Sequence, residues 1–396
     1  MKKPLLGVAA ALAQTVLVLG LLLWVRPLAA VNALIDRAFR VPGKASKLVP
    51  TRRNPDLHET SFGDNPLASF RHLAATWAKH PGAKRVVFAG NSQLQFVTLA
   101  DDEPWTDQPE PTAVDWVAER YAASGRPVVC YRLSAGALSY TEALWSLLYL
   151  VNHPEVKPDA LVLQANYQGF WNSGLRSGML TLLDDPAFAA AAAHLAQPGS
   201  SLFAEAFEQA IQKHAAEQDR RTKGPGPAAA GTTLPAGHHL ETRLREALDA
   251  NFPLFRQRGE HKVDLLNTLY RGRIYLLGLR ASSARSISGP RLDRSRASLE
   301  AIAAVCRANG VRMMIYDAPL NPRVSLFKTA ADRSGYVDYL ARFSRERQVP
   351  LFDLSAIVPE RFWGRLLDGP EPLHLSRAGH KQLASVLFEK LGEQGF

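Results

Sequence analysis

The chain is poor in cysteine: two occur among 396 residues, Cys130 and Cys306. Two cysteines exclude the disulfide framework of a small secreted domain and every four-cysteine zinc site. In an exported chain the two thiols could pair with each other. We favour the interpretation that each is a free core residue, because Cys130 ends an apolar run and Cys306 lies on the face of an expected helix.

Signatures of metal and nucleic-acid binding are also lacking. His238 and His239 lie in a stretch rich in glycine, proline and alanine, without partners at ligand spacing. No zinc-finger spacing or RNA-binding motif occurs. The sequence therefore predicts no metal, no cofactor and no nucleic-acid partner. Acidic residues are outnumbered, 37 to 47, and the net charge of +10 suits an anionic partner such as lipid head groups or an acidic polymer.

The N-terminus carries a long apolar run. Lys2 and Lys3 precede residues 4–24, which contain no charge. A helix needs about 20 residues to cross a bilayer, whereas the apolar part of a signal peptide has about 7–15. We therefore predict that residues 1–30 are a retained, single-pass signal anchor with the body outside the cytoplasm. The alanine-rich residues 27–30 leave cleavage as the alternative.

Short apolar runs alternate with segments of helical spacing over most of the remaining chain. This rhythm is typical of a doubly wound parallel sheet. The expected strands are residues 86–89, 127–133, 159–165, 311–317 and 349–353. The expected helices include residues 66–79, 113–122, 140–151, 298–308, 334–347 and 376–391. We divide the chain into an anchor (1–30), a stalk with a first helix (31–80) and an α/β domain (81–396).

Residues at about 172–296 interrupt the rhythm. They contain alanine-rich helical stretches and a low-complexity segment at 223–237. We interpret the region as a helical insertion that forms a cap over the edge of the sheet. Its last part, 271–296, is rich in arginine and could lie on an anionic membrane surface. We favour the alternative, an ordinary packed helix with a solvated basic face.

Two distant motifs carry the chemistry. The first expected strand ends at Gly90-Asn91-Ser92, which places the Ser92 hydroxyl at the carboxyl edge of the sheet, where open α/β folds bind ligands. Near the other end, His374 precedes the last helix. A serine nucleophile needs an imidazole to take its proton. We therefore predict Ser92 as nucleophile and His374 as general base. The rival His380, inside the helix, is expected to be packed or exposed.

Four residues at successive expected strand ends follow the order Ser92, Gly136, Asn166 and His374. In this order the chain resembles the SGNH (GDSL-type) hydrolase superfamily. The resemblance implies a flavodoxin-like three-layer sandwich around a five-stranded parallel sheet. It also implies an oxyanion hole made by the backbone N–H groups of Ser92 and Gly136 and the side chain of Asn166.

Two positions depart from the family pattern. The usual Gly-Asp-Ser is Gly-Asn-Ser here, and the aspartate three residues before the histidine is replaced by Glu371. The resemblance assigns Glu371 as the carboxylate that orients His374, with Asp368 as the alternative. Glutamate is one methylene longer than aspartate, so this carboxylate would need a shifted backbone.

The anchor, the insertion and a Pro-x-Asn sequence at Asn321 are similar to the D-alanyl transfer protein of the lipoteichoic-acid pathway (DltD-like). In that relative, Ser-Ser-Glu stands where this chain has Asn91-Ser92-Gln93. The resemblance implies a protein of the bacterial inner membrane, facing the periplasm or the outer side, that works beside a membrane-bound O-acyltransferase.

Two hypotheses follow. The first is a membrane-anchored serine esterase or O-acyltransferase that acts on acyl groups of a cell-envelope glycan or polymer through an acyl-serine intermediate. The second is a non-catalytic accessory protein that binds a membrane-bound O-acyltransferase or polysaccharide-export machinery. The departures at Asn91 and Glu371 keep the second hypothesis open.

Overall fold

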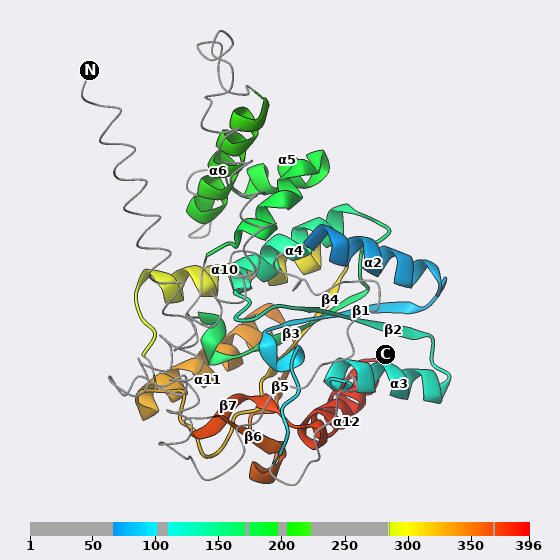
Figure 1. Ribbon diagram of the computed structural model, residues 1–396, viewed down its shortest axis with the longest axis vertical. Helices are drawn as coiled ribbons and strands as arrows, with labels where there is room; N and C mark the ends of the chain where they lie inside the picture. Colours follow the sequence, from blue (N-terminus) through cyan, green and yellow to red (C-terminus); the bar gives the residue numbers. More distant parts are fainter. Residues whose placement is uncertain are drawn as a thin grey trace, which may run out of the picture. The chain divides into compact units, whose positions relative to one another are not determined.

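The computed structural model describes residues 66–100, 110–170, 174–196, 204–222, 284, 286–366 and 369–396 (Figure 1). Apart from 219–222, these residues belong to one compact unit, 43–218 with 281–396. The second unit, 1–42 with 219–280, falls almost entirely outside the described residues. So do the predicted anchor and most of the stalk. Within the described ranges, no helix combines the length and apolarity needed to cross a membrane.

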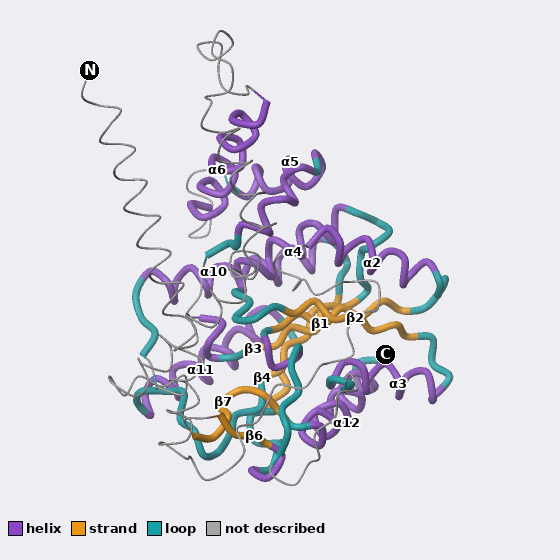
Figure 2. The backbone as a smooth tube through the Cα atoms, viewed as in Figure 1, coloured by secondary structure: helices purple, strands orange, loops and turns teal. Residues whose placement is uncertain are grey.

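The core is a five-stranded parallel sheet, as predicted (Figure 2). Its strand order is β2-β1-β3-β4-β5. The order reverses between β1 and β3, and open α/β sheets bind ligands outside the carboxyl ends of the strands at such a point. The strands are β1 (Lys84–Gly90), β2 (Val128–Ser134), β3 (Ala160–Ala165), β4 (Arg312–Asp317) and β5 (Leu351–Asp353).

Alternate residues of the strands enter two separate cores. Val87, Leu161 and Ile315 belong to one buried cluster, whereas Val86, Val162 and Met314 belong to the other. This alternation follows from the two-residue period of a strand, and it explains why both faces of the strands are apolar. Cys306 is in the first cluster and Cys130 packs against the second, so the two free cysteines lie on opposite faces of the sheet.

Helices cover both faces (Figure 1). Those packed in the first cluster are α2 (Pro66–Ala78), α4 (Tyr140–Asn152), α10 (Pro290–Ala308) and α11 (Ala330–Arg347). Those packed in the second are α3 (Ala113–Ser124) and α12 (Arg377–Glu393). Side-chain caps define where several of these helices begin. Ser139 and Glu142 form a capping box on α4, and Ser376 caps the N-terminus of α12.

The insertion does not form the expected cap, as far as the structure describes it. Its described elements are η3 (Ser177–Asp184), α5 (Pro186–Leu195) and α6 (Ala204–Thr222). They pack against α4 through Trp145, whose ring meets Phe188 and Phe207 edge-on and whose Nε1 donates to the Met179 carbonyl at 2.9 Å. The reason is that α4 is apolar on its outer side as well, so it needs a second layer of helices.

The end of the predicted insertion belongs to the core. Helix α10 begins at Pro290, eight residues before the expected start at Ser298, because Gly289 at φ 68° ends the preceding segment and a proline is favourable in the first turn. The arginines of 291–296 therefore lie on a packed helix. The Arg296 guanidinium stacks 4.7 Å from the Tyr339 ring. Most of the basic segment, 271–283, lies outside the described residues.

A second, two-stranded sheet was not predicted. It consists of β6 (Trp363–Leu366), preceded by η5 (Glu360–Phe362), and of β7 (Gly369–Leu375), paired antiparallel. His374 thus lies on strand β7, directly before the last helix. Pro370 and Pro372 argue locally against a strand, but each of these strands pairs on one side, where a missing N–H is tolerated.

Candidate active site

Ser92 and His374 meet at the carboxyl edge of the main sheet. His374 Nε2 lies 3.0 Å from Ser92 Oγ, although 282 residues separate them in the chain. Both side chains are half-buried. The Phe96 ring meets the imidazole edge-on, with centroids 5.7 Å apart. The hydroxyl and the imidazole are therefore within hydrogen-bond distance at a site that substrate can reach, which is the arrangement that nucleophilic catalysis requires.

The end of β1 presents Ser92 through a tight turn, η1 (Ser92–Leu94). Gly90 is required there, because a Cβ atom would lie 2.5 Å from Gln164 Oε1. That same oxygen accepts the Asn91 N–H at 2.9 Å. Asn91 Oδ1 in turn accepts the Gln93 N–H at 2.9 Å and caps η1. An asparagine keeps the capping oxygen that an aspartate would offer, so the Gly-Asn-Ser departure leaves the turn intact.

Three consecutive carbonyls of the strand that carries His374 accept hydrogen bonds from residues that follow Ser92. Gln93 Nε2 donates to the Leu373 carbonyl at 2.8 Å, Thr98 Oγ1 to the His374 carbonyl at 3.2 Å, and the Thr98 N–H to the Leu375 carbonyl at 2.9 Å. The segment that follows the nucleophile thus places the base. These bonds fix the distance between Ser92 and His374.

Gln93 is the residue that sequence reasoning missed. It is 2% exposed, and its Nε2 also donates to the Pro319 carbonyl at 3.0 Å. Its Oε1 accepts from Gln164 Nε2 at 2.6 Å. The side chain therefore joins the ends of β1, β3, β4 and β7. A long amide directly after the predicted nucleophile was the available signal, because an amide that the fold buries there must find partners.

The strand register brings Gly136 and Asn166 level with Ser92. Ala89 pairs with Leu133 on one side and with Leu163 on the other. Ser92, Gly136 and Asn166 each lie three residues after these paired residues. Asn166 Oδ1 accepts the Gly169 N–H at 2.8 Å, which turns its Nδ2 to the opposite side of the amide. The structure thus places all three proposed donors at one edge, and their role as an oxyanion hole stays a prediction.

No protein-family model matches this chain, and no curated protein matches it. Solved esterase structures do match it. The psychrotrophic esterase EstA from Pseudoalteromonas sp. is 8% identical over 78% of this chain and 98% of its own, with a TM-score of 0.36. A GDSL-like lipase from Bacteroides thetaiotaomicron is 10% identical over 82% and 98%, with a TM-score of 0.33. The M. smegmatis aryl esterase is 8% identical over 78% and 99%, with a TM-score of 0.32. Scores this low carry no argument about activity, which must come from the site.

The carboxylate partner of His374 stays a prediction. The backbone of Glu371 belongs to β7, but its side chain is outside the described part of the structure, and so is all of Asp368. Among the described residues, no group of three or more His, Cys, Asp or Glu side chains is placed to hold a metal ion.

His380 is buried, and its two ring nitrogens have structural partners. Nδ1 accepts the Ala113 N–H at 3.1 Å, which leaves Nε2 to donate to the Phe96 carbonyl at 3.0 Å. The ring is therefore neutral and joins α12 to α3 and to the segment after Ser92. Burial, the largest cause, lowers the pKa of His380 from 6.5 to about 4.

This lowered pKa predicts a pH dependence of stability. Below pH 6.5 the unfolded chain binds a proton at His380, whereas the folded chain binds none until about pH 4. The free energy of unfolding should therefore fall as the pH falls through this window, by up to roughly 3 kcal/mol. Urea unfolding at several pH values should show this slope in the wild type and lose it in His380→Gln. Equal slopes in the two proteins would contradict the assignment.

Asp317 ends β4 at the same edge of the sheet, and it is buried. Tyr336 Oη donates to its carboxylate at 2.7 Å, and burial raises the pKa of Asp317 to about 7. Asp317 affects the pH dependence with the opposite sign to His380. Its contribution to the free energy of unfolding is fully present below the ordinary pKa near 4, and it is lost as the pH rises through 7. The His380 slope must therefore be taken as a difference between the two proteins.

A cavity of about 170 Å³ lies on the β3 and β4 side of the site. Its lining includes Tyr167, Phe170, Arg296, Tyr336 and Tyr339. Tyr167 directly follows Asn166, and Tyr336 is the hydrogen-bond partner of Asp317. Among the described residues, the cavity combines aromatic walls with the cationic Arg296 and the acidic Asp332.

Proposed function

We propose that this chain is an SGNH-type serine esterase or O-acyltransferase. The observation that supports it is the 3.0 Å approach of His374 Nε2 to Ser92 Oγ at the carboxyl edge of a 2-1-3-4-5 parallel sheet. A serine hydroxyl is a weak nucleophile unless a base takes its proton, and an imidazole at this distance is such a base. The proposed attack on an ester bond therefore depends on Ser92 and His374.

In the proposed reaction, Ser92 Oγ attacks the acyl carbonyl carbon while His374 Nε2 takes the hydroxyl proton. The negative charge forms on the carbonyl oxygen, where the N–H groups of Ser92 and Gly136 and the Asn166 amide donate to it. The tetrahedral adduct then expels the alcohol, which takes the proton from His374. Water or a second hydroxyl, deprotonated by His374, attacks the acyl-Ser92 ester and restores the enzyme.

The setting we propose is the bacterial inner membrane, with the body facing the periplasm or the outer side. The apolar residues 4–24 and the net charge of +10 support it. The substrate class would be an acylated cell-envelope glycan or polymer, and the partner a membrane-bound O-acyltransferase. Similarity to the DltD-like branch supports this finer assignment through the anchor, the insertion and Asn321.

The test is labelling of the full chain, purified in mild detergent, with a fluorophosphonate probe and assay with p-nitrophenyl acetate. We expect one probe adduct, located at Ser92 by peptide mass spectrometry. Ser92→Ala should abolish both the adduct and the turnover. Exposed Ser334→Ala is the matched control and should retain both. A folded wild type that neither reacts with the probe nor hydrolyses the ester would exclude a free-standing esterase.

The second candidate function is a non-catalytic accessory protein that binds a membrane acyltransferase or a nascent polysaccharide. The departure at Glu371 favours it, because a glutamate is one methylene longer than the aspartate of the family pattern and would need a shifted backbone to orient His374. An unreactive but folded wild type that co-purifies from membranes with an acyltransferase would support this function in place of the first.

A further inference from the structure

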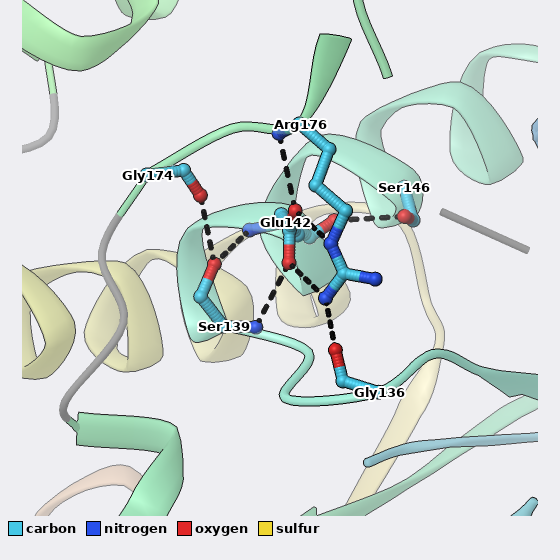
Figure 3. Close-up of polar contacts among 6 residues, drawn as sticks. All are labelled: Gly136, Ser139, Glu142, Ser146, Gly174 and Arg176. Atoms are coloured by element: carbon cyan, nitrogen blue, oxygen red, sulfur yellow. Dashed lines mark hydrogen bonds and ion pairs between the residues drawn. The ribbon is translucent and has the colours of Figure 1, made fainter. Parts of the chain in front are cut away.

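Glu142 shows how this fold accommodates a buried charge (Figure 3). Its side chain has no exposed surface, and Arg176 Nε lies 2.9 Å from its Oε1. Oε1 also accepts the Arg176 N–H at 3.2 Å, and Oε2 accepts the Ser139 N–H at 3.1 Å. The Arg176 guanidinium donates to the Gly136 carbonyl as well. Both members of this ion pair therefore have partners within the chain, which is the condition for burying a charge.

Arg296 on α10 is held differently. Its Nε is buried and has no hydrogen-bond partner among the described residues. Glu300, one turn further along the helix, forms an ion pair with Arg347 instead. Asp332, which lines the same cavity as Arg296, is engaged in the capping box of α11. A buried donor that the chain leaves unpaired is explained where a ligand supplies the acceptor.

Arg296 lies in the wall of the cavity of about 170 Å³, together with four aromatic rings. Two rings come from η2 (Tyr167–Phe170), and Tyr336 and Tyr339 come from α11. The Tyr336 ring meets both rings of η2 edge-on, with centroids 5.7 Å apart. The Tyr339 ring lies 4.7 Å from the Arg296 guanidinium. A guanidinium stacked on a ring keeps its N–H donors in its own plane, where an acceptor can approach them.

The cavity adjoins the edge of the sheet that carries the nucleophile. Tyr167 directly follows Asn166, a proposed oxyanion donor. Tyr336 Oη donates to the carboxylate of Asp317, the last residue of β4, at 2.7 Å. Two walls of the cavity thus begin at the carboxyl ends of β3 and β4. A polymeric substrate is long enough to reach both Ser92 and this cavity.

The lining of the cavity defines the chemistry of its ligand. The planar fork of Arg296 matches a carboxylate or a phosphate, and the carboxylate of Asp332 can accept a hydroxyl. Aromatic rings pack against the apolar faces of a sugar ring. The volume is below the ~300–1,000 Å³ of sites that bury a drug-sized ligand, so the cavity holds one ring and not a chain of sugars. An acyl chain would leave both charged groups without a partner.

We propose that this cavity is a subsite for an acidic sugar of the substrate glycan, and that Arg296 binds the carboxylate or phosphate of that sugar. The inference rests on the proposed function, and it specifies the substrate class as an anionic glycan. The net charge of +10 agrees with it, because a cationic protein attracts an anionic polymer.

Binding is tested first, by saturation-transfer difference NMR on the full chain in mild detergent, because this measurement needs no turnover. The probes are methyl glucuronoside, which carries a carboxylate, and glucose 6-phosphate; neutral methyl glucoside is the control. We expect saturation transfer to the ring protons of at least one anionic sugar, with a Kd at least about tenfold lower than that of methyl glucoside. The tighter of the two anionic probes identifies the acidic group.

Arg296→Met separates a binding role from a structural one. Methionine keeps an apolar stem beside the Tyr339 ring but removes every donor, so the Kd for the anionic sugar should rise at least about tenfold. The melting temperature should not fall, because the buried Nε that is removed has no partner in the chain. Arg291→Met makes the same change at an exposed position of α10 and should alter neither quantity.

The same variant tests the choice of substrate. We expect the wild type to release acetate from acetylated polygalacturonate with a kcat/KM at least about tenfold higher than from acetylated glucomannan, a neutral polymer. Arg296→Met should lose this preference. Its kcat/KM for p-nitrophenyl acetate should stay at the wild-type value, because that ester carries no anionic group for Arg296 to bind.

The outcomes separate this inference from the function on which it rests. Equal affinity for charged and neutral sugars, or a Kd that Arg296→Met leaves unchanged, overturns the subsite and leaves the esterase intact. A folded wild type that binds the anionic sugar through Arg296 but shows neither labelling nor turnover supports the subsite and overturns the esterase. If Arg296→Met fails to fold, Arg296→Lys keeps the charge without the fork, and the same Kd criterion applies.

Discussion

His374→Ala is expected to lower kcat/KM for p-nitrophenyl acetate by about 10³-fold or more. The imidazole is the group within hydrogen-bond distance of Ser92 Oγ, at 3.0 Å, and without it the hydroxyl attacks with its proton still bound. The double variant with Ser92→Ala should be no less active than either single variant, because a nucleophile and its base act as a unit and their losses do not add. Initial rates and fluorophosphonate labelling of the three variants measure this.

His153→Gln is the matched control for this experiment. His153 follows the C-terminal end of α4, and its Nε2 lies 3.1 Å from Asp185 Oδ2. It is not one of the proposed catalytic residues. Its replacement should leave kcat/KM within a factor of about two, since changes remote from the chemistry rarely alter the transition state. If His374→Ala kept a tenth or more of the wild-type activity, another group would be the base and the proposed mechanism would be wrong.

Gln93→Glu is expected to lower the free energy of unfolding at pH 8 by at least about 3 kcal/mol. The substitution keeps the shape of the side chain but puts a charged acceptor where Nε2 now donates to the Pro319 and Leu373 carbonyls. Two buried carbonyls lose their donor, and a charge is buried against them. Because Leu373 precedes His374, a displaced β7 should also reduce kcat by at least about tenfold. Urea unfolding and ester hydrolysis test both effects.

The pH dependence of Gln93→Glu makes the prediction specific. Burial should raise the pKa of the introduced glutamate, so the lost stability should return in part as the pH falls and the acid regains a proton to donate. Gln382→Glu makes the same chemical change at an exposed position of α12 and should alter stability by less than about 0.5 kcal/mol. A Gln93→Glu protein as stable as wild type at pH 8 would show that the amide does not bridge the strand ends.

Much of the candidate site could be predicted from the sequence because its residues follow strands with a local signal. Ser92, Gly136 and Asn166 each come just after a short apolar run, and the carboxyl ends of parallel strands share one edge. The same local reasoning missed β7, since Pro370 and Pro372 oppose a strand and their tolerance depends on a pairing that the chain makes on one side. It also placed the insertion over the sheet edge, whereas its described helices pack on α4.

By itself, the sequence determined the five parallel strands, the helices between them and the order of serine, glycine, asparagine and histidine at the strand ends. Each of these depends on hydrophobic period or on turn residues, which act over a few positions. Only the tertiary structure decided that Gln93 bridges four strand ends and that Arg176 holds the Gly136 carbonyl from a buried Glu142. Such contacts join residues far apart in the chain, and a polar side chain acquires its partners when the fold removes it from water.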